Sequence, residues 1–395
     1  MKIRKSDGLD RLRKWLKRPG TCQLGIGAVS KNVVDAAIAL AYETEAPLML
    51  IASRRQVEAR ELGGGYVENW TTTDFANYVR THDPQGLILL CRDHGGPWQN
   101  SRDYERCVSE EEAMESAIAS FRADIEAGFD ILHIDTGIHP KGEPPTEIAL
   151  KRLIELYEAC WAHAEKSCRE IAFEVGTEDQ RGGELDAPGF VSLLGDVKQA
   201  LNKRGLPSPL FMVAQTGTKV VETRNIGTFD EPATREQVQR DILSMTGKAR
   251  DLGVHIKAHN CDYLPTPTLR KLVGCGIGAA NIAPEFGVVE TRELLSLFEK
   301  RMPECRDKFV SLVLQSGKWK KWMAVGTKAG ERERAEIAGH YVYATREFNQ
   351  LKELIEKQVT NLDEQLRLKA KAAISRYLDA FGLTSEQQSA HRKAA

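Results

Sequence analysis

Short apolar runs in this chain repeatedly end in polar side chains. The run GLILLC is followed by Asp93 and His94, and the run DILHI ends at Asp135. Later apolar runs lead in the same way to Glu178, Gln215, His259, Asn281 and Glu285. In a (β/α)₈ barrel the loops after the strands converge on one face, and that face carries the chemistry. The pattern therefore predicts an α/β fold of the TIM barrel type, with these side chains gathered at its mouth.

Strand-like and helical segments alternate along the chain. Strands are expected at 22–29, 47–52, 86–91, 130–135, 170–176, 209–215, 254–259 and 277–283. Helical patterns follow them at 32–43, 72–80, 111–128, 146–166, 188–203, 234–252, 266–273 and 289–300. This alternation, without tight hairpin signals, favours a parallel sheet covered by helices, and the number of units allows closure into a barrel. An open doubly wound sheet is the structural alternative.

The chain has 395 residues, which exceeds the length of one barrel. A TIM barrel typically takes roughly 250 residues, so the sequence leaves room for an appendage. We expect the barrel over residues 1–303 and a helical C-terminal extension over residues 304–395. Within 331–358, apolar residues recur at helical spacing, from Ile337 to Ile355. Such an apolar stripe needs a partner surface, which is either the barrel flank or a second subunit.

Composition excludes several classes of partner. The 55 basic residues nearly balance the 56 acidic ones, so bulk charge does not favour binding to nucleic acid or to an anionic membrane. A small-molecule partner is therefore favoured. The basic N-terminus lacks the apolar core of a signal peptide, and no CxxC pair occurs among the eight cysteines. We expect an unexported protein of the reducing cytoplasm.

Four strand-end residues form a candidate metal site: His94, Glu178, Gln215 and His259. Two imidazoles, a carboxylate and an amide oxygen suit a borderline divalent ion, with Zn²⁺ favoured and Mn²⁺ or Co²⁺ as alternatives. A histidine taken alone at such a position is more often structural, with a hydrogen bond to a neighbouring loop. The prediction depends on their joint placement at the barrel mouth, because no short metal motif supports it.

Three carboxylates are candidates for catalysis. Asp93 adjoins His94 and could move a proton next to an ion, although a loop cap or an ion pair with Arg92 is the alternative. Asp135 could orient a substrate hydroxyl or share the proton transfer, or it could simply cap a helix or pair with a loop lysine such as Lys141. Glu174 falls inside its strand, where a carboxylate is costly unless paired, so we expect it to support the site. His133 falls within an apolar run and is interpreted as a core histidine with satisfied hydrogen bonds.

Several residues are candidates for binding a substrate. The segment QTGTK supplies Thr216 and Lys219, and GIGAANIAPE supplies Asn281 and Glu285. Loops late in a barrel often hold phosphate through backbone N–H groups, although turn chemistry explains these glycines as well. Other potential anion anchors are Arg54, Arg55 and Arg224. The WKKW segment at 319–322 could stack on a sugar, but such clusters more often pack their tryptophans inward.

Several motifs, taken in order, resemble one known family. They are LIASRRQV, RDHGGPWQ, AGFDILHID, EVGTE, VAQTGT, KAHNCDY and WKKW, which together cover roughly residues 20–325. This set is similar to the GatZ/KbaZ-like family, the so-called non-catalytic subunits of class II D-tagatose-1,6-bisphosphate aldolase and relatives of the zinc class II aldolases. The resemblance implies a metal site on Asp93, His94, Glu178, Gln215 and His259.

The resemblance also implies two alternative functions. One is a metal-dependent aldolase that cleaves a ketose or ketose phosphate, or epimerises it at C4. The other is a non-catalytic subunit that stabilises a separate aldolase, and the partner would then be that catalytic subunit or a further copy of this chain. Lys257 stands where the family carries an acidic residue, so we expect it near the mouth, favouring an anionic ligand.

Overall fold

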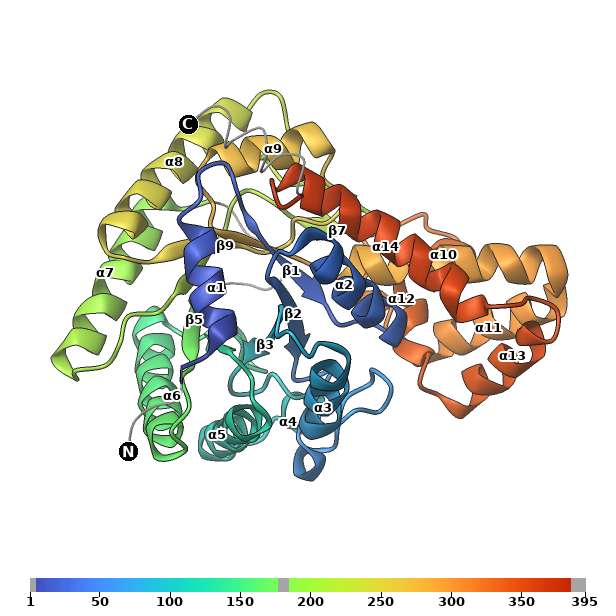
Figure 1. Cartoon of the computed structure of the whole chain (residues 1–395), viewed down its shortest axis with the longest axis horizontal. Helices are drawn as coiled ribbons and strands as arrows, with labels where there is room; N and C mark the ends of the chain where they lie inside the picture. The colour runs from blue at the N-terminus through green and yellow to red at the C-terminus, as the bar shows by residue number, and fades with distance from the viewer. Residues whose placement is uncertain (1–4, 177–184, 385–395) are drawn as a thin grey trace.

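The computed structural model describes residues 5–176 and 185–384 and forms a closed parallel barrel (Figure 1). The barrel strands are β1 (Gln23–Gly27), β2 (Leu48–Ser53), β3 (Ile88–Gly95), β4 (Ile131–Asp135), β5 (Ala172–Gly176), β6 (Phe211–Ala214), β9 (His255–Ala258) and β10 (Ala279–Ile282). They follow one another round the barrel in chain order, and β10 pairs with β1 to close it. The predicted TIM barrel is therefore confirmed, and the open sheet is excluded.

Helices cover the outside of the barrel between successive strands. They are α2 (Lys31–Thr44), α3 (Thr72–His82), α4 (Ser101–Arg106), α5 (Glu110–Ala127), α6 (Thr146–Lys166), α7 (Ala187–Lys203), α8 (Arg235–Asp251), α9 (Thr266–Gly274) and α10 (Pro284–Arg301). Local sequence fixes their ends: α5 begins at a capping box of Ser109 and Glu112 and stops at Gly128, whose φ is 96°. Apart from α4 and the earlier start of α10, these bounds lie close to the predicted ranges.

The barrel interior changes from apolar to polar along its axis. Its lower part joins Met49, Leu89, Ile131 and Phe211 to Leu9 and Leu12 of α1 (Asp7–Leu16), which plugs the end where the strands begin. Two residues further along each strand the side chain points inward again, so Ile131 is followed by His133 and Ala172 by Glu174. This periodicity places the polar groups towards the carboxyl ends of the strands.

The C-terminal part of the chain builds its own small core and then returns to the barrel. It comprises α11 (Pro303–Ser316), α12 (Glu331–Ala338), α13 (Arg346–Glu356), α14 (Leu362–Ala380) and short turns η2 (Lys320–Trp322) and η3 (Gly339–Val342). Its core joins Phe298 of α10 to Phe309, Phe348 and Ile355, so the apolar stripe packs within the chain. The boundary expected at 303 thus falls inside this core.

Helix α14 belongs to the barrel rather than to the extension. In Figure 1 it runs beside α2 and α10, and it also contacts α9. Ile374 and Tyr377 join the main hydrophobic core. Glu285, at the start of α10, accepts hydrogen bonds from the Tyr377 hydroxyl and from Arg376 (2.8 Å). The helix therefore fills the gap between the last and first barrel units.

The first testable prediction concerns α14. Replacing Ile374 by Ala is expected to lower the free energy of unfolding by about 2–5 kcal/mol, because the side chain is fully buried in the barrel core. Leu368→Ala in the same helix is the control: its side chain is 56% exposed, so the change should stay within about 0.5 kcal/mol. Urea denaturation measures both. Equal effects would contradict the placement of α14 in the barrel.

Several short elements of the described chain were not predicted. A small antiparallel hairpin, β7 (Val220–Val221) with β8 (Arg224–Asn225), follows β6, and a 3₁₀ turn η1 (Arg60–Leu62) follows β2. The prediction also contained no helix at the N-terminus, where α1 lies. Within residues 5–176 and 185–384, none of the helices combines the length and apolar character of a membrane-crossing segment.

Candidate metal centre

Five polar side chains from five strands meet in the barrel at the carboxyl ends of the strands. Asp93, His133 and Glu174 point inward from β3, β4 and β5, and His259 follows β9 directly. One ligand atom from each of these four residues lies within 4.8 Å of all the others. The amide nitrogen of Asn281, from β10, lies 3.2 Å from Asp93 Oδ1 and 3.1 Å from His259 Nε2. The cluster is therefore assembled by strand periodicity alone.

Glu174 is the central carboxylate of this cluster. Its Oε1 lies 3.1 Å from His259 Nε2 and 3.5 Å from His133 Nδ1, and its Oε2 accepts a hydrogen bond of 2.6 Å from Lys257 Nζ. Burial raises the pKa of Glu174, but Lys257 and the imidazoles outweigh burial and bring it to about 2. Burial also keeps the pKa of His259 below its ordinary value. A charged carboxylate and a neutral imidazole are both competent metal ligands.

A bulge in β3 turns His94 into the same space as Asp93. The pairing of β3 with β4 shifts register between Arg92 and Gly95, and His94 has a φ of 45°. In a regular strand neighbouring side chains point to opposite faces, so the bulge lets both residues face the mouth. Asp135 Oδ2 lies 2.7 Å from His94 Nδ1, while His94 Nε2 lies 3.8 Å from Asp93. A carboxylate behind one imidazole nitrogen is the usual support of a histidine ligand.

The charges of Asp93 and His94 stabilise each other. Burial by itself raises the pKa of Asp93, but the imidazoles of His94, His133 and His259 hold it well below its usual range. Burial lowers the pKa of His94, yet Asp93 and Asp135 raise it to about 9. Asp93 therefore remains an ionised carboxylate at neutral pH, able to contact a cation.

A cavity of about 170 Å³ opens above the cluster. Asp93, His94, His259 and Asn281 form its floor, while Arg55 and Gln99 from loops after β2 and β3 form part of its wall. The C-terminal extension supplies further lining residues, namely Lys321, Trp322, His340 and Tyr341. The cavity is therefore built jointly by the barrel and by the helices that follow it.

The residues present fit a divalent ion. Two imidazoles and two carboxylates match the nitrogen and oxygen ligands that Zn²⁺, Mn²⁺ and Co²⁺ accept. His133 Nδ1 accepts the backbone N–H of His94 at 3.2 Å, but its Nε2 is buried without a hydrogen-bond partner among the described residues. This histidine is therefore only partly satisfied, short of the environment expected for it. Lys257 neutralises one oxygen of Glu174, which leaves the other oxygen facing the imidazoles.

The predicted metal ligands are placed in different ways. His259 belongs to the cluster and His94 lies beside it, with its ring centroid 5.0 Å from that of His259. Gln215 is half-buried directly after β6, and Glu178 lies outside the described residues. Of the predicted catalytic residues, Asp93 and Glu174 join the cluster, whereas Asp135 holds His94 from behind. The full ligand set therefore stays a prediction.

The structure places four predicted substrate residues away from the cavity, which Asn281 does line. Lys257 was expected near the mouth, but it is only 1% exposed and is paired with Glu174 inside the barrel. The carboxylate of Glu285 binds the backbone N–H of Tyr263 and the residues of α14. Thr216 is buried against Thr218, and Lys219 is exposed at the start of the β7–β8 hairpin.

Sequence reasoning missed His133 and the part of the cavity wall that comes from the extension. The signal for His133 was present, because it stands two residues before Asp135 on one strand and must share its face. The WKKW segment was interpreted mainly as packing, and Trp319 does pack in the small core of the extension. Lys321 and Trp322, however, line the cavity, and local sequence held no signal for that long-range contact.

Known proteins resemble this chain over most of its length. The family model described as D-tagatose-1,6-bisphosphate aldolase subunit GatZ/KbaZ-like matches residues 17–394. The D-tagatose-1,6-bisphosphate aldolase subunit GatZ of Salmonella paratyphi B is 25% identical over 319 residues, which cover 73% of this chain and 72% of the relative.

Two solved structures share the fold at lower identity. A probable tagatose 6 phosphate kinase from Sinorhizobium meliloti aligns with a TM-score of 0.73 at 20% identity, covering 91% of this chain and all of the other. Fructuronate-tagaturonate epimerase UxaE from Cohnella laeviribosi aligns with a TM-score of 0.56 at 13% identity, covering 97% and 89%. With the family match over nearly the whole sequence, the chain belongs to the D-tagatose-1,6-bisphosphate aldolase subunit GatZ/KbaZ-like family.

Proposed function

We propose that this protein is a metal-dependent enzyme that acts on a ketose or ketose phosphate by aldol or retro-aldol chemistry. One observation carries the proposal: two carboxylates and two imidazoles converge below an open cavity at the carboxyl ends of the barrel strands. Active sites of TIM barrels are found at that end. The names of the relatives, which are subunits of a tagatose-bisphosphate aldolase, support the class of substrate.

The roles of the side chains follow from their places. When bound, a divalent ion would polarise the carbonyl group of the substrate. Asp93, ionised and facing the cavity, accepts the proton of the hydroxyl group next to the bond that breaks, and returns it when the bond re-forms. Asp135 holds His94 in one orientation beside this carboxylate. If the aldehyde fragment rotates and presents its opposite face before the carbon–carbon bond re-forms, the same steps epimerise the ketose at C4.

A second function is favoured by the word subunit in the family description. In that case the chain would stabilise a separate aldolase without turning over a sugar itself. The convergent ligand cluster argues against this alternative, because a scaffold has no chemical need for it. Co-purification with an aldolase, together with the absence of bound metal and turnover in the isolated chain, would favour the scaffold.

The test begins with the purified full-length protein. Elemental analysis is expected to find Zn, Mn or Co in stoichiometric amount, and Zn is the expected ion because the cluster combines imidazole and carboxylate ligands. A screen of ketoses and their phosphates then measures cleavage and C4 epimerisation before and after treatment with a chelator. A protein that binds no divalent ion and whose turnover a chelator does not change would refute the proposal.

His133→Ala gives a sharper prediction about the cluster. Metal affinity is expected to fall by at least about 100-fold, because even residues that only orient a ligand are worth about 10–100-fold. His82→Ala is the control, since His82 is exposed at the end of α3 and should leave affinity unchanged. Competition with a chromogenic chelator measures both variants. Equal affinities would remove His133 from the proposed site.

A further inference from the structure

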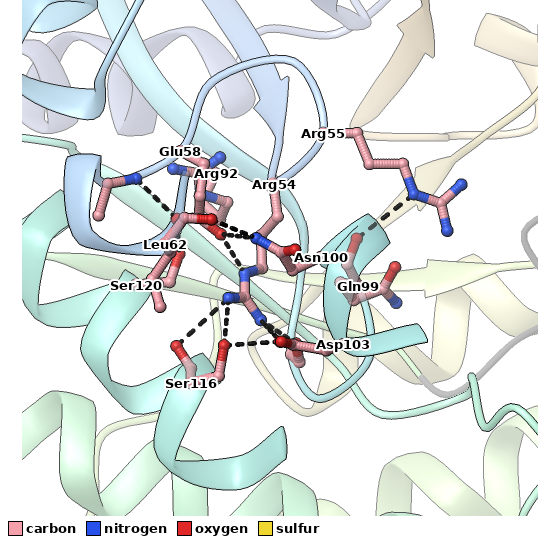
Figure 2. Close-up of polar contacts among 12 residues, drawn as sticks. Arg54, Arg55, Glu58, Leu62, Arg92, Gln99, Asn100, Asp103, Ser116 and Ser120 are labelled. Atoms are coloured by element: carbon pink, nitrogen blue, oxygen red, sulfur yellow. Dashed lines mark hydrogen bonds and ion pairs between the residues drawn. The ribbon is translucent and has the colours of Figure 1, made fainter. Parts of the chain in front are cut away.

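A buried network of charged side chains lies beside the cavity (Figure 2). Arg54 is fully buried, and its Nε donates to Glu58 at 2.6 Å. Its Nη1 donates to the carbonyl oxygen of Gly96 (2.9 Å), and its Nη2 donates to the hydroxyl of Ser116 (2.7 Å). The carboxylate of Glu58 also accepts from Asn100 at 3.3 Å. These bonds tie the loop after β2 to the loop after β3 and to α5.

A second buried guanidinium fixes the same loop from below. Arg92 pairs with both oxygens of Asp124, at 2.8 and 2.6 Å. Its Nη1 donates to the backbone carbonyl oxygens of Ala52 (2.9 Å) and Val57 (2.7 Å). These two residues bracket Arg55, so the backbone that carries Arg55 is held on both sides. A side chain mounted on such a segment keeps its direction without a ligand.

Arg55 itself points away from this network. Figure 2 shows its side chain directed apart from that of Arg54, with one contact, from Nε to the carbonyl oxygen of Gln99 at 3.4 Å. It is half-buried and lines the cavity. Among the described residues no carboxylate lies within 4.0 Å of its guanidinium, in contrast to Arg54 and Arg92. Arg55 therefore lines the cavity without an acidic partner in the described part of the chain.

A second cation lies on the wall that the extension contributes. Lys321 Nζ is 4.8 Å from the ring centroid of Trp322 and 5.1 Å from that of Tyr341. Within the described part of the chain it also has no carboxylate at ion-pair distance. Tyr341 in turn packs against Tyr66, with 4.8 Å between ring centroids. The cavity wall thus presents two cations that no carboxylate of residues 5–176 or 185–384 pairs with.

We propose that Arg55 binds an anionic group on the substrate, with Lys321 as a second cation. A guanidinium presents two parallel N–H groups that match the oxygens of a phosphate or a carboxylate. The ligand is therefore an anionic ketose, either a phosphate ester or a uronate. That a ketose carries the anionic group rests on the proposed function. Neutral ketoses lack the group that Arg55 is placed to bind.

A chain of contacts connects this anchor to the reacting end of the cavity. Gln99 accepts from Arg55 through its carbonyl oxygen and donates through its side chain to Asp135 Oδ2 at 2.9 Å. The same oxygen of Asp135 lies 2.7 Å from His94 Nδ1. Arg55 and the imidazole beside Asp93 are thus fixed relative to each other. An anion bound at Arg55 would place the rest of the ligand above the cluster.

The test measures binding to the full-length protein by titration calorimetry, so that it needs no turnover. The probes are D-tagatose, D-tagatose-1,6-bisphosphate and D-tagaturonate. We expect an anionic probe to bind at least about 10-fold more tightly than D-tagatose, and Arg55→Met to weaken that probe by about 10–100-fold. D-Tagatose binding should not change. Arg55→Lys keeps the positive charge but loses the two parallel N–H donors of the guanidinium. Its affinity for the anionic probe should lie between those of wild type and Arg55→Met.

Arg240→Met is the matched control, because Arg240 is 63% exposed on α8 and should not affect binding. Preference for the bisphosphate or for the uronate identifies the anionic group. The inference is overturned if Arg55→Met binds both anionic probes as tightly as wild type, or if neither probe binds better than D-tagatose. Arg55-dependent binding in a protein without metal or turnover supports the anchor and refutes the enzyme. If D-tagatose and its bisphosphate instead turn over at equal rates, and Arg55→Met does not change those rates, the enzyme is supported and the anchor is refuted.

Discussion

Asp93→Asn is expected to lower the turnover of a ketose substrate by about 10²–10⁴-fold, the range that a positioned acid or base contributes. The amide keeps the size and the hydrogen-bonding shape of the carboxylate but cannot accept a proton. The native carboxylate is ionised, because the surrounding imidazoles hold its pKa far below the usual range, and it lines the cavity. The loss should therefore appear in kcat rather than in substrate binding.

The same variant separates two roles for Asp93, which also belongs to the ligand cluster. If its main role is proton transfer, Asp93→Asn retains the metal and loses turnover. His259→Ala should instead lose both, because an imidazole ligand is removed. Asp307→Asn serves as the control, since its side chain is 70% exposed on α11. Steady-state kinetics and metal analysis on the three proteins decide the matter, and an unchanged turnover in Asp93→Asn would refute the assignment.

The sequence predicted the barrel well because each unit carries its own local signals. Alternating runs, capping residues such as Ser109 and glycines such as Gly128 fix where strands and helices begin and end. The polar strand ends also pointed to Asp93 and His259, since parallel strands must deliver their ends to one face. Glu174 was predicted on another ground, because a carboxylate inside a strand must be paired. These inferences required only the periodicity of a strand and the direction of the sheet.

The remaining features depend on contacts between distant segments. Lys257 was expected at the mouth, but it lies inside β9, two residues before His259. There it is buried in the barrel, and Glu174 neutralises its charge. Glu285 follows a strand as the others do, yet the returning helix α14 takes its carboxylate. Lys321 reaches the cavity because the extension folds back over the barrel. No local sequence pattern predicts these long-range contacts, because they depend on how distant segments pack together.

The buried network behind Arg55 gives the second large effect, this time on stability. Arg92→Met is expected to lower the free energy of unfolding by about 3–5 kcal/mol, the range found when one partner of a buried ion pair is removed. Both Arg92 and Asp124 have fully buried side chains, so the remaining carboxylate would lack a charge partner. Two backbone carbonyl oxygens, of Ala52 and Val57, would lose their donor as well.

The design compares this pair with one at the surface and with a double variant. Arg270→Met breaks the exposed pair of Arg270 and Asp379, whose side chains are 55% and 46% exposed, and should cost less than about 1 kcal/mol. Arg92→Met combined with Asp124→Leu should recover part of the loss, because no unpaired charge is then left in the core. Urea denaturation followed by circular dichroism measures all of them. A double variant less stable than Arg92→Met alone would show that the loss comes from packing and the carbonyl contacts rather than from the stranded carboxylate.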